Sequence, residues 1–356
     1  MKIQHGTRCV FQLGLGFLFV WGIYSCQSYV QEVVVNSYSN HSSTPINKQS
    51  GYYSQAIFWG TTGVGSLFTP PLVTSIGPKW SLVVGSVAFG VYSLSFLFLQ
   101  EWIMYCTSFL CGVGGAILWT AEGAYLSYAS TPSTVHRNAS LWWFVVLLWY
   151  PFGSVFLYFV TKNQSVMTLT HIRIIYGVFT AANILGTIIL ALLPNLEPNR
   201  ATATPLIGLI SSRIGRAPII MLGCILHLLG CIFAFLNLPA NAAIDRTSDV
   251  GYITNPSIPL ALSVSFMFGV CDSIVSTQWN SILPALYKGE ESAHSYAISN
   301  LLQTISSAIA SYYSAKLLLH WQMLIVCVMN FLATVCFMPV EWEAQLKPDG
   351  LQRIIK

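Results

Sequence analysis

The sequence predicts an all-helical, polytopic membrane protein, and three observations lead to this prediction. Hydrophobic residues make up 54% of the 356-residue chain, and its mean hydropathy is +0.62. Charged residues account for 8% of the chain, against ~25% in typical soluble proteins. Ten stretches approach or exceed the ~20 mostly apolar residues that a transmembrane helix needs. These features argue against a water-soluble globular fold.

The ten predicted spans follow one another along the whole chain. They are residues 10–31, 52–75, 80–99, 102–128, 139–161, 170–194, 217–238, 258–283, 294–319 and 321–340. The first follows Lys2 and Arg8, as the apolar part of a signal peptide would. Its apolar stretch exceeds the ~7–15 residues of a signal peptide, so we expect it to remain as a helix.

Polar segments divide the predicted helices into groups. A Ser- and Asn-rich loop covers Asn36 to Ser50, and a second long loop covers Asn241 to Pro259. Between them, the helix-hostile stretch PNLEPNRATAT at 194–204 marks a join. We therefore expect an N-terminal six-helix bundle at 1–194, a cytosolic linker at 195–204, an incomplete C-terminal bundle of about four helices at 205–340, and a cytosolic tail at 341–356.

The distribution of Lys and Arg predicts the orientation, because cytosolic loops are enriched in both. With a cytosolic N-terminus, eleven of these residues lie inside. Five lie outside: Lys48, Lys162, Arg173, Arg246 and Lys316. Both termini are therefore predicted to be cytosolic, in either the plasma membrane or an endomembrane. Of the glycosylation sequons, Asn40 and Asn163 would face outside, whereas Asn138 would face the cytosol and stay unmodified.

Two pairs of similar segments indicate an internal repeat. IGPKWSLVVG at 76–85 resembles IGRAPIIMLG at 214–223, and GVGGAILWTAEGAYL at 112–126 aligns without gaps with GVCDSIVSTQWNSIL at 269–283. Both pairs occur in the same order and direction, which favours parallel repeats. In the second half, only PLIGLISS at 205–212 precedes the turn, which is too short to span a bilayer. We therefore expect a helical hairpin to be absent between Pro194 and Pro205.

Glu122 is the first candidate functional residue, because a carboxyl group at membrane depth is costly and usually faces a protein interior or a wet cavity. Two roles stay open: a titratable group in a central cavity, or a protonated acid bonded to a neighbouring helix. Gly112, Gly114 and Gly115 on the same helix predict close contact with another helix. Trp119, one turn before Glu122, is a further candidate for cavity or helix contact.

The second half carries its own polar candidates. Asp272, Ser276 and Asn280 share one helix face at spacings of four residues. Lining of a cavity and bonding between helices both fit that face. His227 lies in the middle of a predicted span. We expect it to donate a hydrogen bond to another helix, with a proton relay as the alternative.

Two basic turns are predicted to be structural. Gly77 and Lys79 form the first, and Arg213, Gly215 and Arg216 form the second. Each turn places positive charge near helix ends on the predicted cytosolic face, where it can fix the arrangement of the helices.

Several classes of site are not expected in this chain. Its nine cysteines lie in or beside apolar spans without CxxC or Cys/His spacing, so we expect neither a disulfide framework nor a metal site. No nucleophile–base pair, P-loop, HExxH or dinucleotide fingerprint occurs. A basic cluster with interleaved aromatic residues is also missing. We expect no enzyme activity, no cofactor and no nucleic-acid partner.

Several sequence blocks together resemble the uncoordinated-93 family (the ion channel regulatory protein family) of the major facilitator superfamily, and within it the branch of major facilitator superfamily domain-containing protein 11. The blocks are ILWTAEGAYLSY, HRNASLWWF, SRIGRAPIIMLG, FGVCDSIVSTQWNSIL, LLLHWQ and VEWEA. The resemblance implies the major facilitator fold, with two parallel-repeat bundles and twelve helices. This chain would keep about ten, lacking helix seven and most of helix eight, as a splice form or an incomplete gene model would. The family more usually has an amide at the position of Glu122.

The resemblance also implies a function. Members of this family look like regulatory or trafficking partners of other membrane proteins, so the expected partners are the lipid bilayer and an ion channel or receptor subunit, contacted through helix faces and outer loops. The alternative is a solute transporter that works by alternating access on a small solute, proton-linked through Glu122 or Asp272. The absent seventh helix argues against transport, because it would leave the central cavity open on one side.

Overall fold

A computed structural model describes residues 2–41, 46–130, 134–161, 168–196, 216–244, 249, 251–253, 257–286 and 290–346. Throughout these ranges every regular element is a helix. The chain divides into two compact units: unit 1 is Met1–Leu206 with Ala297–Tyr312, and unit 2 is Ile207–Tyr296 with Tyr313–Lys356. These units differ from the bundle borders expected at 194 and 205, so those borders stay a prediction.

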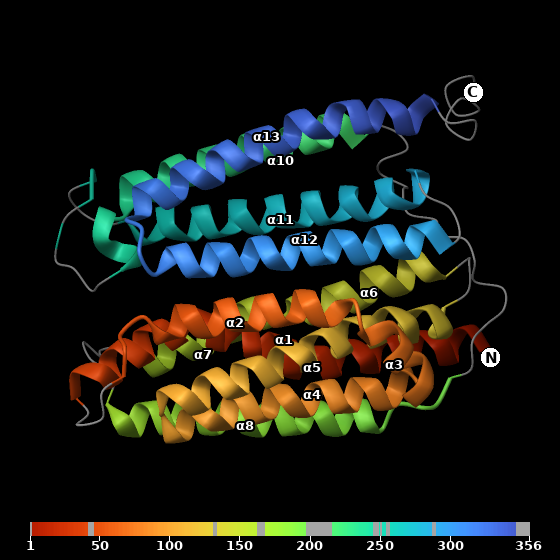
Figure 1. The fold of residues 1–356 in the computed structure, drawn as a ribbon, viewed down its shortest axis with the longest axis horizontal. Coiled ribbons are helices and arrows are strands. Elements are labelled where there is room, and N and C mark those ends of the chain that lie inside the picture. The colour runs from red at the N-terminus through yellow and green to blue at the C-terminus, as the bar shows by residue number, and fades with distance from the viewer. Residues whose placement is uncertain are drawn as a thin grey trace. The chain divides into compact units, whose positions relative to one another are not determined.

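Figure 1 colours the helices in chain order, from red at the N-terminus to blue at the C-terminus. The first group comprises α1 (Lys2–His41), α2 (Ser50–Ser66), α3 (Thr69–Ile76), α4 (Pro78–Ser95), the 3₁₀ turn η1 (Phe96–Phe98), α5 (Glu101–Ala129), α6 (Val135–Leu147), α7 (Trp149–Thr161) and α8 (Leu169–Ala191). The second group comprises α10 (Arg216–Asn237), the 3₁₀ turn η2 (Ala240–Ala243), α11 (Ile258–Leu286), α12 (Glu290–Ser314) and α13 (Leu319–Leu346).

Each of the ten expected spans corresponds to one or two of these helices. Within the described residues, seven helical segments are long and apolar enough to cross a membrane: Gly6–Ser39, Pro78–Phe98, Glu101–Ala129, Leu169–Ala191, Arg216–Asn237, Ile258–Ser276 and Leu319–Ala344. The all-helical, polytopic class is therefore confirmed. The other three expected spans are the α2–α3 pair, the α6–α7 pair and α12.

Prolines account for the two broken spans. Pro70 and Pro71 occupy the first turn of α3, where their missing N–H groups cost least, so the chain restarts a helix there instead of continuing α2. The second break falls at Leu148, between α6 and α7. Pro151 follows four residues after Leu147 and cannot donate to its carbonyl, so the helix is interrupted at that point.

α1 is longer than the sequence predicts. A loop is expected to start at Asn36, but Asn36 to His41 continue the helix. The Ser39 hydroxyl donates to the carbonyl of Asn36 at 2.9 Å, so this polar side chain bonds back to its own helix. At the other end of the chain, α13 continues to Leu346, into the segment expected to be a tail.

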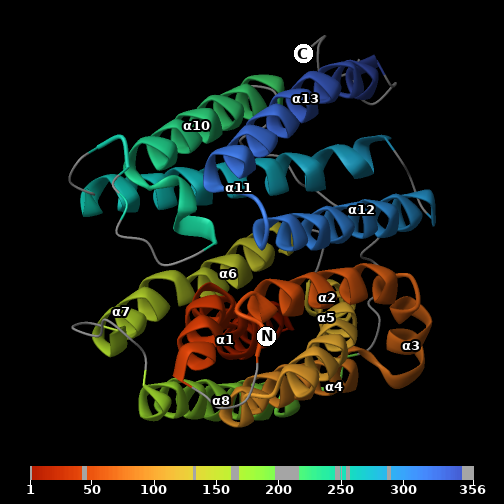
Figure 2. The same ribbon diagram turned by 60° about the vertical axis from the view of Figure 1, so that its left-hand side comes forward.

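α1 lies at the centre of unit 1, with α2, α4, α6, α7 and α8 around it (Figure 2). Its core side chains are fully buried, among them Leu13 and Phe17. Glycines let the neighbouring helices approach: a methyl group added at Gly14 would lie 3.0 Å from Cβ of Val145 in α6. Such small residues are typical of helix contacts in membranes. Unit 1 is therefore packed tightly around its first helix.

Unit 2 is built on α10, which packs against α11 and α13. A methyl group added at Gly230 would lie 2.8 Å from the ring of Phe268 in α11. At the end of α10, the Asn237 amide accepts from the backbone N–H of Ser257 at 2.7 Å and donates to its carbonyl at 3.2 Å. This pair of bonds joins α10 to the segment that begins α11.

Candidate functional site

α5 contacts two helices through its three glycines. Gly112 faces α2, where an added methyl group would lie 2.7 Å from the carbonyl oxygen of Phe58. Gly114 faces α4, where an added methyl group would lie 2.9 Å from the carbonyl oxygen of Gly85. Gly115 also faces α2, where an added methyl group would lie 3.2 Å from the Thr62 hydroxyl. The face identified in the sequence is therefore a contact surface with α2 and α4, and it fixes the position of the rest of α5.

Glu122 lies two turns beyond these glycines and is only 8% exposed. Among the described residues, its carboxyl group has no hydrogen-bond or ion-pair partner. One turn further, the Tyr125 hydroxyl donates to the carbonyl of Pro194 at 2.9 Å, which joins this end of α5 to the end of α8. The structure thus places Glu122 in a packed part of unit 1, and its role stays a prediction.

Trp119 belongs to a cluster of aromatic rings that joins α1, α5 and α6. Its ring centroid lies 4.9 Å from that of Trp21 and 5.7 Å from that of Phe17, both edge to face. Trp142 and Trp143 of α6 lie 6.1 and 6.4 Å from it. Each such pair stabilises packing by about 0.5–1.5 kcal/mol beyond the burial of its area. Trp119 therefore packs against rings of α1 and α6, and its functional role stays a prediction.

A buried polar network joins α1, α2, α4 and α5, and the sequence analysis did not identify it. The Gln31 amide donates to the carbonyl of Gly51 at 2.8 Å and accepts from the Tyr92 hydroxyl at 3.0 Å. Ser54 Oγ lies 2.7 Å from the Tyr92 hydroxyl and 2.6 Å from Ser108 Oγ. The side chains are fully or almost fully buried. Because few polar partners exist at this depth, these bonds select one arrangement of the four helices.

A second, shorter chain of bonds links α1, α4 and α8. The Ser93 hydroxyl donates to Oε1 of Gln27 at 2.8 Å and accepts from the Asn183 amide at 3.1 Å. Nε2 of Gln27 and Oδ1 of Asn183 are buried without a partner among the described residues. Gln27 and Gln31 lie four residues apart on α1, so they share one face of the helix. This spacing could have indicated a polar contact surface from the sequence alone.

The first basic turn has a backbone conformation that favours glycine. Gly77 separates α3 from α4 with φ of +86°, a region that other residues rarely adopt. Its N–H donates to the carbonyl of Val73 at 2.9 Å, and its carbonyl accepts from the N–H of Ser81 at 3.1 Å. Lys79 lies over the ring of Trp80 at 5.0 Å. Gly77 thus ends α3 and begins α4, and the structural role of this basic turn stays a prediction.

In the second basic turn, Arg213 and Gly215 lie outside the described residues, and Arg216 begins α10. Nε of Arg216 donates to Oε2 of Glu341 near the end of α13 at 2.6 Å. Both side chains are largely buried. Arg216 was predicted to fix helix ends, and its partner Glu341 could not be identified from the sequence.

The other candidates of unit 2 do not form a common site among the described side chains. Asp272 is exposed and Ser276 is half-buried, while the side chain of Asn280 lies outside the described part. The ring of His227 packs against Phe268 at 5.1 Å. Its Nε2 is buried and has no hydrogen-bond partner among the residues that the structure describes. A hydrogen bond from this nitrogen to another helix, the role expected for His227, is therefore not formed there.

The three sequons differ in what the structure describes. Asn163 and the side chain of Asn40 fall outside the described part. Asn138 is buried, accepts from the Thr7 hydroxyl at 3.2 Å and donates to Ser130 Oγ at 3.0 Å. Its amide nitrogen is thus bonded to the residue that follows α5, and its amide oxygen is bonded to α1. Within the described residues, no group of three His, Cys, Asp or Glu side chains could hold a metal ion.

These features define an integral membrane protein whose described polar groups mainly join helices to one another. The family model for the ion channel regulatory protein UNC-93 matches residues 42–205 and 200–338. The chain therefore belongs to the UNC-93 family, as the sequence blocks indicated.

Curated relatives agree with this membership. UNC93-like protein MFSD11 of Xenopus laevis is 25% identical over 426 residues, with 93% of this chain and 95% of the relative covered. Protein unc-93 homolog A of Bos taurus is 29% identical over 126 residues, with 35% of this chain and 25% of the relative covered. Among solved structures, the major facilitator superfamily transporter FucP in its outward conformation is similar, with a TM-score of 0.48 and 13% identity over 94% of this chain and 97% of that one.

Proposed function

We propose that this chain is a regulatory or trafficking partner of an ion channel or receptor subunit, which it contacts through its helix faces and outer loops. The observation that carries this proposal is the match to the UNC-93 family, described as ion channel regulatory proteins, over most of the chain. The packed interior of unit 1 supports it as well. A protein that acts by binding another membrane protein needs a rigid scaffold. The buried polar network, the shorter chain of hydrogen bonds through Ser93 and the aromatic cluster around Trp119 stabilise such a scaffold.

The exposed side chains of α6 and α7 offer a surface for such a contact. Five of the seven large exposed hydrophobic residues on these two helices are aromatic, and we call them the α6–α7 aromatic face: Trp143, Phe144, Phe152, Tyr158 and Phe159. The other two are Leu147 and Val155. The large exposed hydrophobic side chains of α8 are all aliphatic: Leu169, Ile174, Val178, Ile184, Leu185 and Ile188. Lipid chains suit both kinds of side chain, whereas protein interfaces are enriched in aromatic residues. We therefore assign the partner's transmembrane helix to the α6–α7 aromatic face.

The comparisons also support the absence of a hairpin in the second half. The family match is in two parts that meet at residues 200–205. The alignment with the Xenopus laevis relative runs over 426 residues although this chain has 356, so the relative carries residues that have no counterpart here. We propose that these residues belong between Pro194 and Pro205, and that both termini are cytosolic.

One observation favours the alternative function, transport of a small solute by alternating access. Glu122 is buried without a partner among the described residues, and such an acid is a candidate for proton coupling. The test compares uptake into vesicles that contain the wild type or Glu122→Gln. Proton-driven uptake that the substitution abolishes would establish transport. If no solute accumulates with the wild type, the alternative is wrong.

The leading proposal is tested by quantitative capture of the full chain from native membranes. We expect one channel or receptor subunit to co-purify in a near-stoichiometric amount, and depletion of this chain to change that subunit's abundance at its membrane. Phe152→Ala and Phe159→Ala should lower the recovered amount, whereas Ile184→Ala and Ile188→Ala on α8 should not. Recovery of chaperones alone, or equal losses from both faces, would contradict the proposal.

A further inference from the structure

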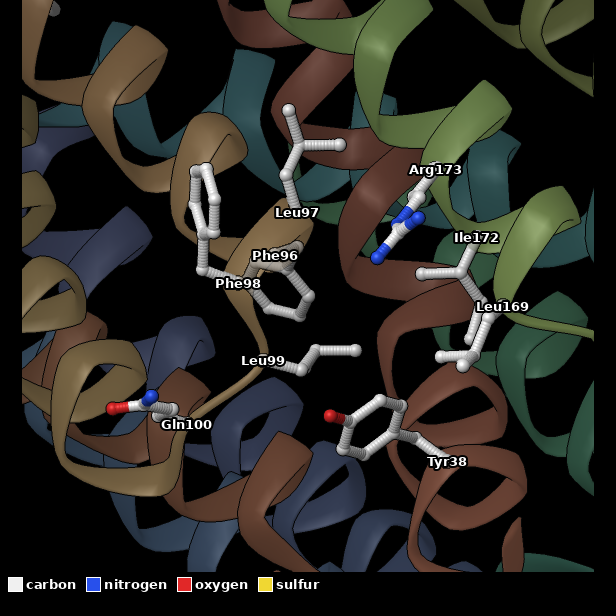
Figure 3. Close-up of a pocket in the computed structure, with 9 residues that line it drawn as sticks. All are labelled: Tyr38, Phe96, Leu97, Phe98, Leu99, Gln100, Leu169, Ile172 and Arg173. Carbon is white, nitrogen blue, oxygen red and sulfur yellow. The ribbon is translucent and has the colours of Figure 1, made fainter. Parts of the chain in front are cut away.

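A cavity of about 230 Å³ lies at one end of unit 1, where three helical elements meet (Figure 3). Tyr38 contributes from the end of α1, Phe96 and Leu99 from η1 and the loop after it, and Ile172 and Arg173 from the start of α8. Phe96, Leu99 and Ile172 are almost fully buried, so the floor of this cavity is apolar. All of its walls belong to unit 1.

Two polar groups turn inward over this apolar floor. Figure 3 shows the Arg173 guanidinium directed into the space between Leu97 and Ile172, and the Tyr38 hydroxyl directed toward Leu99. The amide of Gln100 points away from both. Neither the guanidinium nor the Tyr38 hydroxyl has a hydrogen-bond or ion-pair partner among the described residues. These two donors are therefore free to bind an acceptor that enters the cavity.

The residues around the cavity indicate that it lies at the membrane depth where lipid headgroups meet the acyl chains. Phe98, at its mouth, is 67% exposed, which suits contact with hydrocarbon. Trp102, three residues after Leu99, is also exposed, and tryptophan is enriched at headgroup level. The polar residues Asn47 and Lys48 are exposed just before α2. The nearby carboxyl group of Glu101 is bonded elsewhere: it accepts from the Tyr105 hydroxyl at 2.9 Å and from the N–H of Asn47 at 3.3 Å.

We propose that this cavity binds the phosphodiester headgroup of a membrane phospholipid. The planar guanidinium of Arg173 donates two parallel hydrogen bonds to phosphate oxygens, the geometry that arginine provides and lysine does not. The Tyr38 hydroxyl donates a third. The first methylenes of the acyl chains lie along Phe98 and Leu169. The predicted orientation places this lipid in the non-cytosolic leaflet.

The test uses the full-length chain, purified in detergent and stripped of lipid. Native mass spectrometry measures binding of dioleoyl phosphatidylglycerol, of dioleoylglycerol, which lacks the phosphate, and of soluble glycerol phosphate. The variants are Arg173→Gln, Arg173→Lys and Tyr38→Phe. Lys48→Gln is the matched control, because it removes an exposed positive charge that lies outside the cavity wall.

We expect the phospholipid to bind the wild type and Lys48→Gln equally. Arg173→Gln should weaken binding roughly tenfold or more, as expected from the loss of charge-assisted hydrogen bonds. Arg173→Lys should be intermediate, and Tyr38→Phe should lose a few-fold. Arg173 is exposed, so the lipid-free variant should melt at the wild-type temperature.

Three outcomes would overturn the proposal. Equal binding of phosphatidylglycerol by Arg173→Gln and wild type would exclude the guanidinium as the ligand. Equal binding of dioleoylglycerol would show apolar occupancy without headgroup recognition. Glycerol phosphate that binds as tightly as the phospholipid would assign the cavity to a soluble phosphate instead of a membrane lipid.

Discussion

Nε of Arg216 lies 2.6 Å from Oε2 of Glu341 and joins the first residue of α10 to the last turns of α13. These residues come from two of the blocks that resemble the family, IGRAPIIMLG and VEWEA. Arg216 and Glu341 are 125 residues apart in the chain, and they meet at one end of unit 2. The ion pair gives a physical reason for finding both blocks in one protein.

Removal of one member of this pair should destabilise unit 2. Glu341→Ala removes the carboxylate that accepts from Nε of the largely buried Arg216, and loss of one member of a buried pair costs about 3–5 kcal/mol. Replacement of both residues by methionine should restore much of the stability, because no charge then stays unpaired. Thermal unfolding of the purified single and double variants measures this. A double variant less stable than either single one would contradict the prediction.

The contact between α4 and α5 should tolerate no side chain at Gly114. Gly114→Val must move the backbone of Gly85, and overpacking of this kind costs about 1–3 kcal/mol. Gly123→Ala on the same helix is the matched control, since a methyl group there meets nothing within 4 Å. We expect this control to be neutral or slightly stabilising. Equal loss of folded protein for both variants, measured by size-exclusion chromatography in detergent, would contradict the contact.

Substitutions in the polar network around Gln31 should have non-additive effects on stability. Tyr92→Phe removes the hydroxyl that Gln31 and Ser54 share, at a cost of about 1–3 kcal/mol. Ser54→Ala should cost a similar amount, and the double variant should cost less than the two combined. Tyr252→Phe, at an exposed position, should have no effect on the melting temperature. Strict additivity of the two buried substitutions would show that they do not act together.

Glycosylation tests the predicted orientation. Asn40→Gln and Asn163→Gln should each remove one glycan from protein expressed in eukaryotic cells, seen as a mobility shift that glycosidase abolishes. Asn138→Gln should leave the mobility unchanged, because its amide is buried and bonded to Thr7 and Ser130. A glycan at Asn138 would reverse the topology.

Composition and apolar length predicted the helical membrane class, because both depend on averages over many residues. Averages of this kind do not locate the breaks between α2 and α3 and between α6 and α7, where a few prolines interrupt an apolar run. The turn at Gly77 was predicted from local sequence, and its positive φ explains the glycine there.

The partners within the fold could not be predicted in the same way. Gln31, Tyr92 and Ser54 come from three different helices, and nothing in the sequence pairs them before the helices pack. Trp21 joins the ring cluster of Trp119 for the same reason, although the two are almost a hundred residues apart in the sequence. Single polar or aromatic residues can be identified from the sequence pattern. Their roles depend on partners that come close only in the tertiary structure.

The central claim is contact with another membrane protein through the α6–α7 aromatic face. Site-specific photo-crosslinking in native membranes tests it most directly, with the reactive amino acid at Phe152, which is 66% exposed, or Phe159, 70% exposed. The controls carry it at Ile184 or Ile188 of α8, 55% and 49% exposed. We predict one adduct with a channel or receptor subunit from both α6–α7 positions and none from α8. Lipid adducts alone at all four positions, or the same protein adduct from both faces, would contradict this claim.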